Sequence, residues 1–120
     1  MNIGIAGTGR MGSAIATRLI GLGHTLTVWN RSPEKTKTAV DAGATAAATP
    51  AELATRADVI VTILTNAAAI DAVYYGDHGL LAGEVKGKLF IEMSTVRPET
   101  ERALAARVRE TMNRMHLGGL

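Results

Sequence analysis

Three glycines near the amino terminus have a spacing that suits the binding of phosphate groups, in the G-x-G-x-x-G segment Gly7-Thr8-Gly9-Arg10-Met11-Gly12. The short apolar run 3–6 precedes this segment, and a helical pattern begins at its fourth residue. In that context Gly7 permits a tight turn, Gly9 lets the backbone approach a pyrophosphate, and Gly12 lets the helix pack close to the strand. The amino end of the helix also offers unpaired N–H groups to an anion. The segment therefore predicts a dinucleotide-binding loop, and an ordinary glycine-rich turn is the alternative.

A second group of polar residues follows the expected strand 24–29 and consists of Asn30, Arg31, Ser32 and Lys35. A site that prefers NAD carries Asp or Glu about 20 residues after the glycines, where the carboxylate binds a ribose hydroxyl. No carboxylate stands at this strand end, so a 2′-phosphate would meet no repulsion there. Arg31 can form a fork to such a phosphate and stack on adenine, Ser32 can donate a hydrogen bond, and Lys35 adds charge. The pattern favours NADP(H); the alternative is a solvated Arg31 and a Ser32 that only caps a helix.

The composition excludes several classes of function. The chain has 120 residues, the length of one domain. It contains no Cys, which excludes disulfide frameworks, Cys-ligated zinc and thiol nucleophiles, and its three His are not spaced as metal ligands. Aromatic residues make up 3% and the formal net charge is +2, with both signs interspersed, which disfavours a nucleic-acid partner. No apolar run approaches the roughly 18–20 residues that cross a membrane, and the amino terminus has no signal-peptide pattern, so we expect a cytoplasmic protein without a metal site.

Short apolar runs alternate with helical patterns along the chain. We expect strands at 3–6, 24–29, 44–47, 58–64 and 88–93, and helices at 10–22, from Pro33, from Pro50, at 67–74 and from Pro98 to about residue 115. Each of the three prolines stands at a first helical position. This order predicts an α/β fold: a single Rossmann-type, doubly wound domain with a mainly parallel sheet and helices on both faces.

Three segments, 4–12, 28–32 and 92–95, together resemble the β-hydroxyacid dehydrogenases over about residues 1–110. That family includes 3-hydroxyisobutyrate dehydrogenase, glyoxylate and succinic semialdehyde reductases and imine reductases, and it is akin to the amino-terminal domain of 6-phosphogluconate dehydrogenase. The resemblance implies an NADP-dependent oxidoreductase that transfers hydride.

The resemblance also implies roles for individual residues. Asn30, Arg31 and Ser32 form the turn that selects NADP. Leu64, Thr65 and Ala69 run beside the cofactor. By the same resemblance, Thr95 is expected near the nicotinamide, and Ser94 is expected to help hold a substrate carboxylate. The alternative for Ser94 and Thr95 is that both hydroxyls cap the last helix.

The sequence departs from the family pattern after residue 110. The resemblance implies a helical second domain with a motif whose Lys is the general acid, and the chain's four lysines, Lys35, Lys37, Lys86 and Lys88, lie in no such motif. We therefore expect a binding domain at 1–110, a divergent helical tail at 111–120, no helical catalytic domain and no catalytic residue in this chain. A non-enzymatic dinucleotide-binding module and a chain completed by a second chain are the alternatives.

The carboxy-terminal strand and helix suggest self-association. An apolar strand at 89–93 forms an edge if no further strand follows it, and an apolar edge invites pairing with a second chain. Leu104, Val108, Met112 and Met115 form one apolar stripe on the last helix. We expect a homo-oligomer through this end; the alternative is that the stripe packs on the chain's own sheet.

Overall fold

A computed structural model of the chain describes residues 1–83, 85–93, 102, 105–106 and 108–109. The helices are α1 (Arg10–Gly21), α2 (Lys37–Asp41), α3 (Pro50–Arg56) and α4 (Ala67–Tyr75), with the 3-10 helices η1 (Pro33–Thr36) and η2 (Leu80–Ala82). The strands are β1 (Asn2–Ala6), β2 (Thr25–Trp29), β3 (Thr45–Ala46), β4 (Val59–Thr62) and β5 (Leu89–Glu92).

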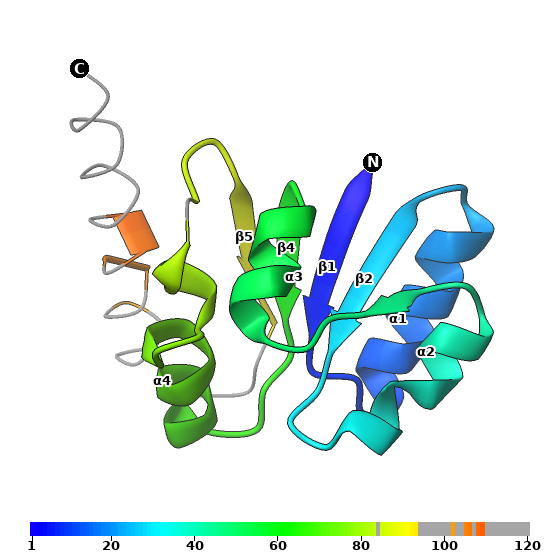
Figure 1. The fold of residues 1–120 in the computed structure, drawn as a ribbon, viewed down its shortest axis with the longest axis horizontal. Coiled ribbons are helices and arrows are strands. Elements are labelled where there is room, and N and C mark those ends of the chain that lie inside the picture. Colours follow the sequence, from blue (N-terminus) through cyan, green and yellow to red (C-terminus); the bar gives the residue numbers. More distant parts are fainter. Residues whose placement is uncertain (84, 94–101, 103–104, 107, 110–120) are drawn as a thin grey trace.

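The five strands form one parallel sheet in the order β3-β2-β1-β4-β5. The chain starts at the centre, builds outward to β3, and then crosses over β1 to β4 and β5. This arrangement confirms the predicted doubly wound Rossmann-type fold. All carboxyl ends of the strands point to one edge, which is the lower edge in Figure 1.

Helices cover the sheet on both faces, and each face has its own core. One core packs Ala16 of α1 and Ala39 of α2 against strand residues such as Ile5 and Val28. The other packs α3 and α4 against the opposite face, with Leu53, Ile70 and Tyr74 almost completely buried. Because both faces are covered, the central strands β1 and β4 are nearly continuous buried runs rather than alternating ones.

Within the described residues the predicted elements are confirmed, but several are shorter than expected. The helix expected from Pro33 begins as the 3-10 turn η1 and continues as the short α2. The strand expected at 44–47 is reduced to two residues. Of the last expected helix, residues 102, 105–106 and 108–109 are helical, and the others lie outside the described residues. Val108 packs against the core on the α3–α4 side, which is the alternative given above for the apolar stripe.

Three side chains fix the ends of α3. Thr49 Oγ1 accepts from the Glu52 N–H at 3.1 Å, and the Glu52 carboxylate accepts from the Ala48 N–H at 2.9 Å, as expected of a capping arrangement. At the other end, Lys88 Nζ donates to the carbonyls of Ala54 and Ala57 at 2.5 and 2.7 Å. The cation thus binds the negative end of the helix and ties α3 to the start of β5.

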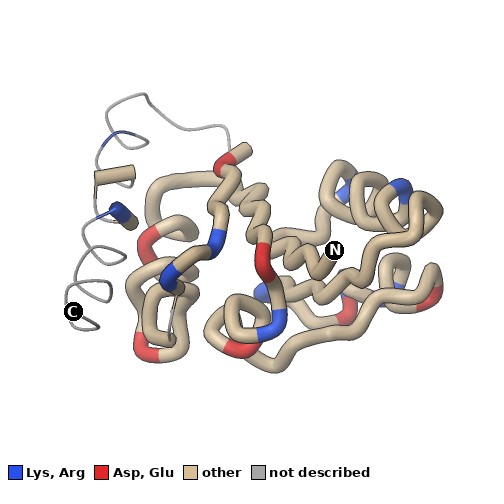
Figure 2. The backbone as a smooth tube through the Cα atoms, turned by 90° about the horizontal axis from the view of Figure 1, so that it is seen from above, with Lys and Arg blue, Asp and Glu red and all other residues tan. Residues whose placement is uncertain are grey.

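Charges are spread over the molecule. Figure 2 shows Lys and Arg interspersed with Asp and Glu along the described chain. Among the described residues, no helix has both the length and the apolar composition to cross a membrane.

Candidate functional site

The glycine segment turns sharply from β1 into α1. Gly7 has φ 106°, and a Cβ there would lie 2.1 Å from the Ile63 carbonyl oxygen. A Cβ on Gly12 would lie 2.0 Å from the Gly7 carbonyl oxygen. The fold itself therefore requires both glycines.

Gly9 differs from these two glycines. Its φ is −67°, and a Cβ there would meet no described atom within 4 Å. Neither backbone conformation nor packing demands a glycine at this position. The bare backbone at Gly9 instead leaves open space beside the first turn of α1, as close approach of a ligand requires.

The amino end of α1 is open. Gly9 is its N-cap and provides no side-chain cap, whereas Thr49 caps α3 and Asn66 caps α4 through side-chain oxygens. The first N–H groups of an α-helix have no partner within the helix. Those of α1 thus remain available to an anion together with the positive end of the helix dipole.

Asn30 holds the glycine loop in place. Its Oδ1 accepts from the Thr8 N–H at 3.0 Å, and its Nδ2 donates to the Ser32 carbonyl at 3.0 Å. The Thr8 carbonyl also accepts from Ser13 Oγ at 3.1 Å. Thr8 is only 2% exposed, so its backbone groups stabilise the loop.

A large cavity of about 980 Å³ runs along the carboxyl edge of the sheet. The structure brings together at this cavity most of the predicted site residues: Gly7, Gly9, Arg10, Met11, Gly12, Asn30, Arg31, Lys35, Leu64, Thr65 and Ala69. Thr8 and Ser32 do not line it. The predicted Ser94 and Thr95 lie outside the described residues.

Sequence reasoning missed further residues of the cavity wall. Trp29 and Met93 stand at the carboxyl ends of β2 and β5, a position that the strand pattern could have indicated. Pro50 and His78 also line the cavity. The Ala51 N–H donates to the His78 carbonyl at 2.9 Å, so the contact joins segments that are distant in the sequence and leaves no local signal. The other missed residues are Ile63, Asn66, Ala68, Ala72 and Val73.

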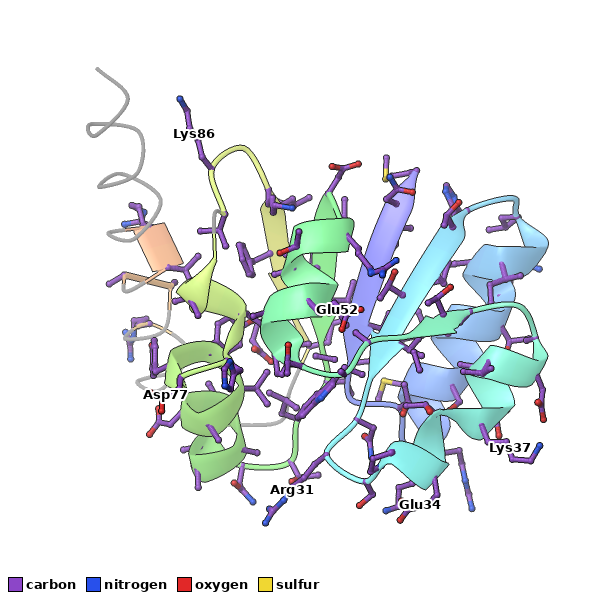
Figure 3. The ribbon with its side chains drawn as sticks, in the orientation of Figure 1. Arg31, Glu34, Lys37, Glu52, Asp77 and Lys86 are labelled. Atoms are coloured by element: carbon purple, nitrogen blue, oxygen red, sulfur yellow. The ribbon has the colours of Figure 1, made fainter. Side chains whose placement is uncertain are left out.

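The wall of the cavity is cationic. Arg10, Arg31 and Lys35 line it, and no Asp or Glu does so within the described part of the chain. Figure 3 shows Arg31 at the carboxyl edge of the sheet, in the turn after β2. Such a wall suits a ligand with several negative charges. No cluster of His, Asp or Glu that could hold a metal occurs in the described residues.

A buried polar network joins β4, α4 and β5 beside the cavity. Thr62 Oγ1, at the end of β4, lies 2.8 Å from the Tyr74 hydroxyl and donates to Glu92 Oε2 of β5 at 2.5 Å. Burial raises the pKa of the Tyr74 phenol far above its ordinary value, and the neighbouring Glu92 adds to this rise. The phenol is therefore neutral and can donate throughout the physiological pH range.

Comparison with known proteins identifies the chain. The family model for the NAD binding domain of 6-phosphogluconate dehydrogenase matches residues 2–116. The chain belongs to this family. The open glycine loop and the cationic cavity therefore belong to an NAD-binding domain.

Relatives of this NAD-binding domain carry several names. The cytokine-like nuclear factor N-PAC of Xenopus tropicalis is 41% identical over 103 residues, covering 86% of this chain and 19% of that protein. The uncharacterized oxidoreductase YfjR of Bacillus subtilis is 40% identical over 106 residues, covering 88% and 37%. L-threonate dehydrogenase of Cupriavidus necator is 38% identical over 109 residues, covering 91% and 37%. The chain therefore spans between 19% and 37% of the length of these curated relatives.

Solved structures share the fold. Psf3 in complex with NADP⁺ has a TM-score of 0.84 at 34% identity, covering 92% of this chain and 39% of that chain. The 3-hydroxyisobutyrate dehydrogenase of Mycobacterium tuberculosis has a TM-score of 0.82 at 25% identity, covering 92% and 37%. A variant of the Myxococcus stipitatus imine reductase, solved with NAD⁺, has a TM-score of 0.80 at 25% identity, covering 92% and 36%. These neighbours confirm the resemblance to dehydrogenases and imine reductases given by the sequence.

Proposed function

We propose that this NAD-binding domain takes NADP(H) in preference to NAD(H). The observation that carries the proposal is the turn after β2, where Arg31 and Lys35 line the cavity and no described carboxylate does. A guanidinium fork and an ammonium group favour a 2′-phosphate, which NAD(H) lacks. The NADP⁺ bound to Psf3 agrees with this preference, while the NAD⁺ in the imine reductase variant makes a direct comparison necessary.

In the proposed binding mode each part of the cofactor has its own group of residues. In this proposal the pyrophosphate binds at Gly9 and the first N–H groups of α1. The 2′-phosphate binds at Arg31, Ser32 and Lys35, and the nicotinamide half lies along Leu64, Thr65 and Ala69. Thr95 would contact the nicotinamide and Ser94 a substrate carboxylate. When bound, the cofactor supplies the hydride acceptor or donor, and the residues named here orient it.

We propose further that these 120 residues bind the cofactor but do not turn over a substrate alone. Of the four lysines, Lys35 lines the cavity among the described residues, and it is assigned to the phosphate rather than to a proton-transfer step. Hydride transfer to a carbonyl or imine also needs a proton donor and a closed site. The helical domain that we expect to supply the proton donor and to close the site remains a prediction. The domain boundary at residue 110 remains a prediction too. Turnover of a semialdehyde or an imine by the purified chain would contradict this part.

A binding module without catalysis is the second candidate. One relative is named a nuclear factor rather than a dehydrogenase. β5 is the edge strand of the described sheet, and its Leu89 and Ile91 and the following Met93 are exposed by 57%, 40% and 45%. An apolar edge strand favours pairing between copies. A sedimentation series that shows only monomer at every concentration would contradict self-association. The cytoplasm stays the expected compartment.

A thermal-shift experiment tests the cofactor assignment. The melting temperature is measured without ligand, with NADPH and with NADH, since a ligand that binds only the folded state raises it. We expect a larger rise with NADPH than with NADH. No rise with either would contradict dinucleotide binding, and a larger rise with NADH would contradict the assignment of Arg31.

A further inference from the structure

The polar network of Thr62, Tyr74 and Glu92 locks the carboxyl ends of β4 and β5 together. Thr62 and Glu92 are register partners in the last described pair of the two strands. The Tyr74 hydroxyl reaches both, at 2.8 Å from Thr62 Oγ1 and 3.2 Å from Glu92 Oε2. Thr62 and Tyr74 are 0% and 1% exposed. Because buried polar groups are costly without partners, this network stabilises one arrangement of the two strand ends.

The residues that follow the network form one wall of the cavity. Residues 63–65 continue from Thr62, Met93 continues from Glu92, and all of them line the cavity. The Met93 N–H also donates to the Thr62 carbonyl at 2.8 Å. The three network residues do not line the cavity themselves. They therefore act on it through the backbone of the residues that follow.

The order of the strands assigns this wall to one half of a dinucleotide. The glycine loop follows β1 at the centre of the sheet, Arg31 follows β2 on one side, and the network joins β4 and β5 on the other (Figures 1 and 3). A pyrophosphate at Gly9 sends the two nucleosides to opposite sides. If the adenosine 2′-phosphate binds at Arg31, the nicotinamide half lies on the side of the Thr62, Tyr74 and Glu92 network. This step rests on the proposed function.

We propose that Thr62, Tyr74 and Glu92 are positioning residues that shape the wall for the nicotinamide half of NADP(H). They fix where β4 and β5 end, and thereby set the affinity for the whole cofactor without affecting its adenosine half. The Tyr74 hydroxyl supplies the link from α4, and its ring also packs on Phe90 with centroids 6.1 Å apart. Removal of the hydroxyl alone should therefore loosen the strand ends while the aromatic packing is kept.

The test compares two ligands on the same protein. NADPH carries both halves of the cofactor, and 2′,5′-ADP carries only the half assigned to Arg31. Trp29 is the one Trp in the chain and lines the cavity, so its fluorescence reports the binding of either ligand. For Tyr74→Phe and for Thr62→Val we expect the Kd for NADPH to rise about fivefold, as the loss of one hydrogen bond implies. The Kd for 2′,5′-ADP should stay unchanged, and Thr62→Ser, which keeps the hydroxyl, should restore the affinity for NADPH.

A matched control separates positioning from general loss of stability. Lys88 lies at the opposite end of β5 and binds the carbonyls at the end of α3. Lys88→Met should lower stability but leave the ratio of the two Kd values as in the unmodified chain. Equal changes for both ligands in Tyr74→Phe and Thr62→Val, or no change for either, would overturn this inference. If the unmodified chain binds neither ligand, the proposed function fails and the inference fails with it.

Discussion

The side-chain carbonyl of Asn30 accepts a hydrogen bond from the backbone N–H of Thr8 at 3.0 Å. The turn after β2 thereby holds the glycine loop after β1, although the two residues are 22 positions apart. The same amide donates to the Ser32 carbonyl. One side chain thus sets the spacing between the segments that we assign to the pyrophosphate and to the 2′-phosphate.

Replacing Asn30 by Asp tests this spacing together with the charge of the turn. In Asn30→Asp the new carboxylate can still accept from the Thr8 N–H, but it cannot donate to the Ser32 carbonyl and it adds a negative charge near Arg31. We expect the affinity for NADPH to fall about tenfold or more, because the 2′-phosphate meets this charge, and the affinity for NADH to fall less. Fluorescence titration of Trp29 measures both. An equal loss for both cofactors would instead indicate that the glycine loop has moved.

Arg31 should discriminate between the two cofactors. Arg31→Ala removes the guanidinium fork, and we expect the affinity for NADPH to fall by about one to two orders of magnitude, as for a charged hydrogen-bonding pair. The affinity for NADH should change only a little. Lys37→Ala is the matched control, since Lys37 is exposed, pairs with Asp41 and does not line the cavity. A loss of equal size in the control would show a general effect of charge.

Gly7 and Gly9 should respond differently to Ala. Gly9→Ala should fold with nearly the same melting temperature, because the added Cβ meets no described atom, but it should lose most of the affinity for NADPH. Gly7→Ala should unfold or lose much stability, because φ is 106° and the Cβ would overlap the Ile63 carbonyl. Circular dichroism and thermal shift measure the two effects. Full binding by Gly9→Ala would contradict a ligand at that backbone.

Much of the fold and half of the site could be predicted from the sequence, because the patterns that indicate them lie within a few consecutive residues. The glycine segment and the turn at Asn30 and Arg31 each occupy a few consecutive residues, and their chemistry depends on spacing along the chain. The central strands β1 and β4 could be predicted because buried parallel strands are nearly continuously apolar. The short length of β3 could not be predicted from the sequence. This strand pairs only with β2, over two residues, and little packing would stabilise a longer strand.

The unpredicted part of the site depends on contacts between distant segments. Trp29 packs against the core and also lines the cavity. The contact of Tyr74 with Thr62 and Glu92 requires the register of β4 with β5 and the packing of α4 on both. No spacing along the sequence encodes that register, so the network could be found only in three dimensions.

Lys88 should contribute to stability through the end of α3. In Lys88→Met the apolar stem is retained, but the charged donor to the Ala54 and Ala57 carbonyls is lost. We expect the free energy of unfolding to fall by about 1–2 kcal/mol, as for loss of a charged hydrogen-bond donor at a helix end. Urea denaturation measures this change. Lys86→Met, at an exposed position in the preceding turn, should leave the free energy of unfolding nearly unchanged, and an equal loss there would contradict the capping role.

Tyr74 should make the fold sensitive to alkaline pH. Burial raises the pKa of its phenol above the ordinary value of 10.0, so above that pH the unfolded chain loses a proton that the folded chain keeps. The unfolded state then binds fewer protons, and stability falls as pH rises beyond about 10. The contribution of Tyr74 is thus fully present at neutral pH and is lost progressively on the alkaline side. Urea denaturation across this range should show a steeper loss for the unmodified chain than for Tyr74→Phe, in which the remaining Tyr75 serves as the internal control. Parallel pH dependence of the two proteins would show that the Tyr74 phenol is not held in its protonated form by the fold.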